Sequence, residues 1–259
     1  MYATERQGLI EQLLIDEGRV SVVDLARRFD VTTETIRRDL DQLEAAGLLR
    51  RVHGGAVPPD RASTAEPSLT QRLQHHGAAK SAIGRRAAAA LGDDFRGSVF
   101  LDAGTTTAAV LAQLAPRLPA GAIELVTHAL TLANVLAEAP NVSLTLIGGR
   151  VRGLTAAAVG AGTVREIESL RPDVAFLGTN GISADFGLST PDPDEAAVKR
   201  AIVRSARRVI AVADAEKFGR ELLVGFASLS DIDVLVTDAA PDAALSAALA
   251  DADVEVWLA

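Results

Sequence analysis

The chain has 259 residues, a formal net charge of −8 and no cysteine, and 48% of its residues are hydrophobic. This composition is typical of a globular protein with one large or two modest domains, and it excludes disulfides, thiolate zinc sites and a cysteine nucleophile. The longest apolar runs are far shorter than the roughly 20 residues of a membrane helix, and the start has no pattern of a secretion signal, so we expect a cytoplasmic protein.

Two further classes of site are not indicated. The four histidines do not have the spacing of a helical metal pair, so we expect no metal site and no cofactor. The acidic balance gives no overall electrostatic case for nucleic acid, so any case for DNA binding must rest on local placement of charge. These histidines are His53, His75, His76 and His128.

The first 57 residues predict helices in quick succession. Paired apolar residues predict an amphipathic helix over 4–16. Ser21 and Asp24 have the spacing of a capping box and predict the start of a second helix. Thr32 is expected to cap a third helix, whose buried stripe would be Ile36, Leu40 and Leu43.

Residues 20–39 have the length and pattern of a helix-turn-helix motif. The strand predicted at 48–52 and the hairpin tip at Gly54-Gly55 would form a wing. On a helical wheel Arg38 lies opposite the buried stripe, where an arginine can reach guanine edges or phosphates. The alternative is a solvated helix face, since residues 1–57 contain 8 Arg and 10 acidic residues, a net −2.

Residues 58–78 are rich in Pro, Ser and Thr and predict a linker, with a weak helix near 69–75. From residue 79 to 259, apolar strands alternate with helices, which predicts a mostly parallel sheet covered on both faces, an α/β domain. The predicted strands are 98–102, 123–127, 142–147, 173–178, 208–214, 232–238 and 254–258.

The sequence DAGTTT at 102–107 follows a strand and opens a helix. Gly104 allows a tight turn, and the hydroxyls of Thr105–Thr107 with the first free amides of the helix would form an anion cradle beginning beside Asp102. The alternative is an ordinary strand-to-helix turn with threonine caps.

Other polar residues fall at predicted strand ends, where open α/β sheets bind ligands. Glu195 and Lys199 are four residues apart and share a helix face, although a surface salt bridge would explain them equally well. The remaining candidates are Asn180 and Gly181 after one strand, Lys217 after another, and Arg152 beside the glycine turn at 148–149.

The segment GRVSVVDLARRFDVTTETIRRDLDQLEAAGLLRRVHGGAV resembles the DNA-binding domain of DeoR-type bacterial repressors nearly throughout. The resemblance implies a winged helix-turn-helix whose recognition helix lies in the major groove, with wing residues adding positive charge toward phosphates. The candidate DNA contacts are Thr32, Thr33, Thr35, Arg37, Arg38, Arg50, Arg51 and His53.

The rest of the chain resembles the same family through FLDAGTTT, LIGGRVRG, FLGTNGIS, GLSTPDPDEAAVKRAI and VADAEKFGR. The effector domains of this family look like ribose-phosphate isomerase. The resemblance implies that Thr105–Thr107 hold a phosphate, while Asn180, Gly181, Glu195, Lys199 and Lys217 line a sugar site. Asn180 stands where the isomerase has a catalytic aspartate, and His128 where relatives often have Asn.

These observations predict a repressor of a sugar-metabolism operon that binds operator DNA as a dimer or tetramer and is released by a phosphorylated sugar. A fructose phosphate is our first guess. The alternative is a phosphosugar isomerase with an accessory DNA-binding domain, which the amide at Asn180 disfavours because an amide is no base. A dinucleotide-binding protein is not indicated, because the G-x-G that begins at Gly160 has Arg165 where the motif needs its third glycine.

Overall fold

The computed structural model describes residues 3–17, 20–46, 48–52, 54–57, 63–137, 139 and 141–259. The chain divides into two compact units, Met1–Ala65 and Glu66–Ala259. Residues 66–78, expected in the linker, therefore belong to the second unit, where Glu66 is buried against Arg152. Residues 58–62 and His53 lie outside the described residues. None of the described helices is long and apolar enough to cross a membrane.

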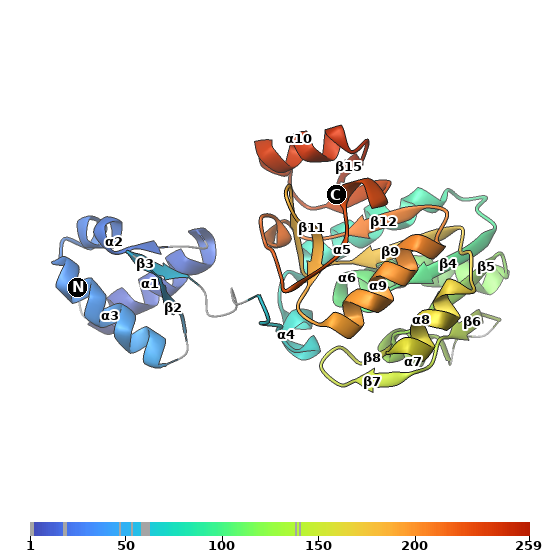
Figure 1. The fold of residues 1–259 in the computed structure, drawn as a ribbon, viewed down its shortest axis with the longest axis horizontal. Coiled ribbons are helices and arrows are strands. Elements are labelled where there is room, and N and C mark those ends of the chain that lie inside the picture. Colours follow the sequence, from blue (N-terminus) through green and yellow to red (C-terminus); the bar gives the residue numbers. More distant parts are fainter. Residues whose placement is uncertain are drawn as a thin grey trace. The chain divides into compact units, whose positions relative to one another are not determined.

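The first unit combines three helices with a small antiparallel sheet of order β1-β3-β2 (Figure 1). The two predicted caps are confirmed: Ser21 accepts a hydrogen bond from the Asp24 amide, and Thr32 accepts one from the Thr35 amide. The elements are α1 (Ala3–Glu17), β1 (Val20–Ser21), α2 (Val22–Phe29), α3 (Thr33–Ala45), β2 (Arg50–Val52) and β3 (Gly55–Val57).

The core of this unit contains the predicted stripe, and Ile36 and Leu40 are completely buried in it. Arg6 of α1 donates two hydrogen bonds to the buried carboxylate of Asp39 on α3, at 2.5 and 3.1 Å. Such a two-point pair fixes orientation as well as distance, so it sets how α1 lies against α3. Gly55 is required where β3 pairs with β1, because a Cβ there would lie 1.9 Å from the Val20 carbonyl oxygen.

The second unit is built on a parallel sheet of seven strands in the order β15-β14-β12-β9-β4-β5-β6. All seven coincide with predicted strands, which confirms the predicted architecture. They are β4 (Gly97–Leu101), β5 (Ile123–Thr127), β6 (Ser143–Leu146), β9 (Val174–Gly178), β12 (Val209–Val212), β14 (Val234–Thr237) and β15 (Glu255–Leu258).

Helices cover both faces of this sheet, and successive strand residues enter different cores. Val99 and Leu101 pack with one set of helices, while Phe100 packs with the other. The first set is α5 (Gly77–Ala88), α6 (Thr105–Leu114) and α7 (Leu130–Ala137). The second is α8 (Ala161–Glu168), α9 (Pro193–Ser205) and α10 (Ala243–Asp251).

Two smaller sheets were not predicted from the sequence. One is an antiparallel sheet of order β10-β11-β13, and the other is the hairpin β7-β8. They are formed by β7 (Arg150–Arg152), β8 (Ala157–Val159), β10 (Gly181–Ser183), β11 (Gly187–Thr190) and β13 (Val224–Ala227). A further helix, α4 (Leu69–Gln74), precedes α5, and its Ser68 cap forms a capping box with Gln71.

The strand order reverses direction between β4 and β9. From β4 the chain runs outward through β5 and β6, and it then returns to β9 and continues outward on the other side. A crevice opens at such a switch point, outside the carboxyl ends of the two strands, and ligands of open α/β sheets bind there. Asp102 and Asn180 follow these two strand ends.

Candidate functional site

The outward face of α3 carries the arginines that the helical wheel predicted. The Arg38 side chain is 78% exposed, and its nearest charged partner is Glu34 at 3.8 Å. Arg37 lies 3.5 Å from the same carboxylate. Thr33 and Arg50 are also exposed. This face is therefore free to meet a partner, and its arginines are loosely held by exposed ion pairs that contribute little.

Arg51 has a different environment from Arg50. Its guanidinium donates to the Arg37 carbonyl oxygen at 3.2 Å and forms an ion pair with Asp41. Its backbone amide donates to the Glu44 carboxylate at 2.6 Å. Arg51 thus joins the wing to α3. Thr32 is likewise engaged, as the helix cap, and its hydroxyl lies 2.9 Å from that of Thr35.

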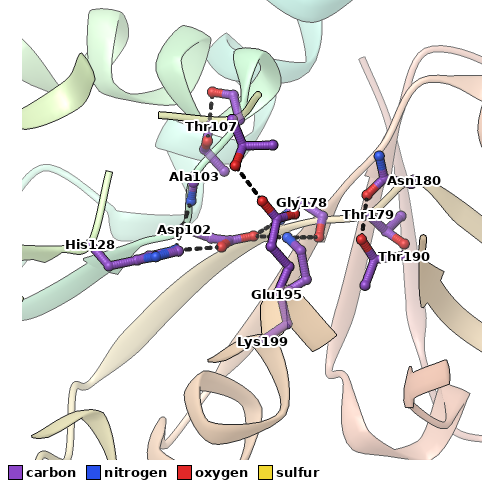
Figure 2. A network of polar contacts seen from close by, with 12 residues as sticks. Asp102, Ala103, Thr107, His128, Gly178, Thr179, Asn180, Thr190, Glu195 and Lys199 are labelled. Carbon is purple, nitrogen blue, oxygen red and sulfur yellow. Dashed lines mark hydrogen bonds and ion pairs between the residues drawn. The ribbon is translucent and has the colours of Figure 1, made fainter. Parts of the chain in front are cut away.

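In the second unit the centre of the site is the carboxylate of Asp102, which is completely buried at the end of β4. It accepts hydrogen bonds from the Lys199 ammonium at 2.5 Å and from the Gly178 amide at 2.9 Å (Figure 2). Its other oxygen lies 3.0 Å from His128 Nε2. His128 Nδ1 in turn faces the Ala158 carbonyl oxygen at 2.9 Å.

The partners of Asp102 keep this carboxylate charged. Burial by itself raises the pKa, but the positive charge of Lys199 and the hydrogen bond with His128 outweigh it and lower the pKa of Asp102 to about 2. At neutral pH the cluster therefore pairs a buried anion with a buried cation. Lys199 also donates to the Gly178 carbonyl oxygen at 2.9 Å, so it faces inward at the strand ends.

The predicted anion cradle begins two residues after Asp102, at the N-terminus of α6. Thr107 donates its hydroxyl to the Gly104 carbonyl oxygen at 2.9 Å and is fully buried, so this hydroxyl is already used. Among the described residues, no hydrogen-bond acceptor is found for the hydroxyls of Thr105 and Thr106 or for the amides of Thr105–Thr107. A helix N-terminus with such free donors suits an anion.

Glu195 and Lys199 share a buried face of α9, as predicted, but they do not pair with each other. Lys199 turns to Asp102, whereas Glu195 accepts hydrogen bonds from Thr155 and, at 3.2 Å, from Arg152. The alternative of a surface salt bridge is therefore wrong. Arg152, on β7, also contacts Asp192 at 3.0 Å and Glu66 at 2.7 Å.

The other predicted site residues fall into three environments. The Asn180 amide oxygen accepts from Thr190 at 3.0 Å (Figure 2). Its amide nitrogen lies 3.4 Å from Glu66. Gly181 is a packing position, because a Cβ there would lie 2.4 Å from the Arg220 carbonyl oxygen. Lys217 is 3.8 Å from the buried Asp214 and has no ion pair with the Asp102 cluster among the described residues.

Several charged side chains with buried polar atoms were not predicted from the sequence. Lys80, at the start of α5, donates to the carbonyl oxygens of Arg72 and His75, and burial lowers the pKa of its ammonium. Glu66 and Arg72 fall in the expected linker, where nothing in the sequence indicated burial. The rarity of lysine was the one signal available for Lys80. Across the part of the chain that the structure describes, no group of three His, Asp or Glu side chains is arranged to hold a metal ion.

Comparisons with known proteins agree along the whole chain. Residues 6–62 match the family model of the DeoR-like helix-turn-helix domain, and residues 75–239 match that of the DeoR C-terminal sensor domain. The GlpR transcriptional regulator of Haloferax volcanii is 39% identical over 94% of this chain and 92% of its own. The glycerol-3-phosphate regulon repressor of Escherichia coli is 33% identical over the full length of both. The repressor GlcR of Bacillus subtilis is 32% identical over 94% and 92%.

Similar solved structures are more distant. Ribose 5-phosphate isomerase A of Methanocaldococcus jannaschii superposes with a TM-score of 0.40 over 54% of each chain, at 12% identity. The full-length sorbitol operon regulator SorC of Klebsiella pneumoniae superposes with a TM-score of 0.36 over 84% of this chain and 90% of its own, at 14% identity.

Replacement of Asp102 should reveal its charge through the pH dependence of stability. The folded-state pKa lies below the ordinary value of 3.8, so the carboxylate stabilises the fold above that pH and loses this contribution as pH falls toward about 2. We expect the unfolding free energies of wild type and Asp102→Asn to converge by roughly 2 kcal/mol between pH 5 and pH 2, measured by denaturant unfolding.

The control is Asp94→Asn, an exposed position, which should change stability by no more than about 0.5 kcal/mol. If the difference in unfolding free energy between Asp102→Asn and wild type stays constant with pH, the carboxylate of Asp102 is not stabilised in its charged form.

Proposed function

We propose that this chain, which belongs to the DeoR family of DNA-binding transcriptional repressors, is released from its operator by a phosphorylated sugar. The observation that carries the proposal is the row of free donors at the start of α6, placed at the switch point between β4 and β9. A dianionic phosphate there would collect several charge-assisted hydrogen bonds from amides and hydroxyls. Fructose phosphates are the first candidates to test.

The polar groups beside this cradle suit the remainder of a sugar. Glu195 and Asp192 offer carboxylate oxygens to hydroxyl groups, and Arg152 and Asn180 offer N–H donors. The buried Asp102–Lys199 pair holds the ends of β4 and β9 and the middle of α9 in fixed positions. The site is therefore largely preformed, which lowers the entropy lost when a ligand binds.

On the DNA side, α3 supplies the reading surface. Its exposed Arg37 and Arg38 would reach base edges or phosphates in the major groove, and Thr33 and Arg50 would add contacts nearby. One winged helix buries limited surface, so we expect a dimer or a higher oligomer on repeated half-sites. The sugar phosphate would act by binding more tightly to the conformation with low operator affinity, because only such a difference shifts an equilibrium.

We also propose that the site binds its ligand without converting it. Asn180 stands at the end of β9 with its amide held by Thr190 and Glu66, and an amide cannot abstract a proton. Pure protein should show no isomerisation of ribose 5-phosphate, fructose 6-phosphate or glucose 6-phosphate, followed by proton NMR over a day. Turnover that Lys199→Ala abolishes would contradict this.

The DNA contact can be tested at Arg38. Arg38→Ala should weaken operator binding by about 1–3 kcal/mol and relax specificity at one base pair, if this residue reads a base edge. Folding should be unaffected, because the side chain is 78% exposed. The measurement is fluorescence anisotropy with operator DNA selected from random duplexes, at one fixed salt concentration. Arg165→Ala, exposed on α8, is the matched control, and equal affinities for all three proteins would remove Arg38 from the interface.

The phosphate cradle can be tested at Thr106. Thr106→Asp adds a negative charge among the donors that would hold the phosphate, while an acidic residue in the first turn of a helix is otherwise favourable. We expect normal operator affinity but no release by sugar phosphates that release wild type. Thr131→Asp places the same charge in the first turn of α7, at an exposed position, and should respond as wild type does. Release of Thr106→Asp at the wild-type ligand concentration would refute the cradle.

A further inference from the structure

Glu66 is the first residue of the second unit, and its carboxylate lies inside that unit. The side chain is only 1% exposed, although it stands in a segment without helix or strand that leads from the first unit to α4. Three groups surround it: Arg152 at 2.7 Å, the Asn180 amide nitrogen at 3.4 Å and Arg72 at 3.9 Å. Two of these, Arg152 and Asn180, belong to the proposed effector site.

These contacts satisfy Glu66 poorly. Its Oε2 atom is buried and has no hydrogen bond of good geometry among the described residues. It does form an ion pair with Arg152 Nη1, at 2.7 Å. Two nitrogen atoms of Arg72, Nε and Nη2, are also buried without hydrogen-bond partners there. A buried polar atom that lacks its hydrogen bond carries a desolvation penalty. Hydrogen-bond donors on Arg72 and an acceptor on Glu66 are therefore available to a ligand.

The charge count around Arg152 points the same way. One guanidinium faces three carboxylates, those of Glu66, Asp192 and Glu195, all within 3.2 Å. Arg72 is too far from Glu66 to hydrogen-bond with it. Like charges held close together repel in a partly buried site, so removal of one carboxylate relieves the other two. Of the three, Glu66 alone lies outside a helix and its cap.

We propose that Glu66 is a latch, which occupies the sugar end of the effector site and is displaced when a phosphorylated sugar binds. The sugar hydroxyls take over Arg152, Asn180 and Arg72, and residues 66–68 are freed from the rest of the second unit. This is the segment that leads to the DNA-binding unit, so its release couples the site to the operator. The identity of the ligand rests on the proposed function. The closed state of the latch is described by the contacts of Glu66 alone and needs no ligand.

By linkage, the latch and the ligand compete. A variant that weakens the latch should bind a sugar phosphate more tightly and operator less tightly than wild type does. Inorganic phosphate fills the cradle at α6 alone and does not reach Arg152, so its affinity should not change. A residue with a merely structural role would give the opposite sign or no change for the sugar phosphate.

The first experiment needs neither DNA nor sugar. Hydrogen exchange of the full-length protein is measured for wild type, Glu66→Gln, Glu66→Ala and the control Glu168→Gln, which removes the same charge from an exposed position on α8. The amides that can report the latch are those of Ser68, Leu69 and Arg72, which donate to Gln71, Leu154 and Ser68. We expect them to exchange about tenfold faster in both Glu66 variants, with β4 and β9 unchanged. Wild-type exchange in both Glu66 variants would overturn the latch, whatever the fate of the repressor assignment.

The second experiment is isothermal titration of the same four proteins with fructose 1-phosphate, fructose 6-phosphate, glycerol 3-phosphate and inorganic phosphate. We expect the sugar phosphate that releases wild type from operator to bind both Glu66 variants about tenfold more tightly, and inorganic phosphate to bind all four proteins equally. Unchanged or weaker sugar phosphate binding in both variants would overturn the latch. If none of these compounds binds wild type, the effector assignment fails and the exchange experiment alone decides on the latch.

Discussion

The carboxylate of Asp102 is the constraint on which the second unit depends. It is completely buried, and a buried charge is tolerated only with an opposite charge and hydrogen bonds around it. Those partners come from three other places in the chain: His128 after β5, Gly178 at the end of β9, and Lys199 on α9. The need to satisfy one carboxylate thus aligns three strand ends and a helix, and the free donors of α6 start two residues further on.

The topology explains why these groups converge. Parallel strands bring their carboxyl ends to one edge of the sheet, and the reversal between β4 and β9 opens a crevice at that edge. The small antiparallel elements then complete the site from outside the main sheet. The hairpin β7-β8 brings Arg152 to Glu195, and β10-β11 fixes Asn180 beside Thr190. In the proposed site, the main sheet therefore places the cradle for the phosphate, and the smaller sheets place the groups proposed to meet the sugar.

The main sheet could be predicted from the sequence, whereas the two smaller sheets could not. The five inner strands of the main sheet, β4, β5, β9, β12 and β14, are mostly apolar and mostly buried. Burial on both faces of a parallel sheet requires such runs, and they can be recognised in the sequence. The strands of the smaller sheets are only three or four residues long, and β10, β11 and β13 contain Gly, so their pairing is determined by tertiary contacts. The start of α6, Glu195 and Lys199 were predicted as site residues, although their individual partners were not.

Glu66 shows the limit most clearly. It stands among Pro, Ser and Thr residues, a composition typical of linkers. Its buried carboxylate contacts Arg152, which lies 86 residues further along the sequence. No local pattern records a contact of that kind. The same holds for Asp39, which has the local surroundings of an exposed helix residue but is paired with Arg6 across the first unit. Paired buried charges are determined by the fold as a whole.

The contacts of Arg51 have a consequence for how operator DNA is bound. Because its guanidinium and its amide both bond to α3, the wing and the reading helix form one rigid body before any DNA is present. A preformed reading surface loses little conformational entropy on docking. If α3 meets the major groove as proposed, such a surface would adapt little, and differences in groove width between operators would be met by bending of the DNA.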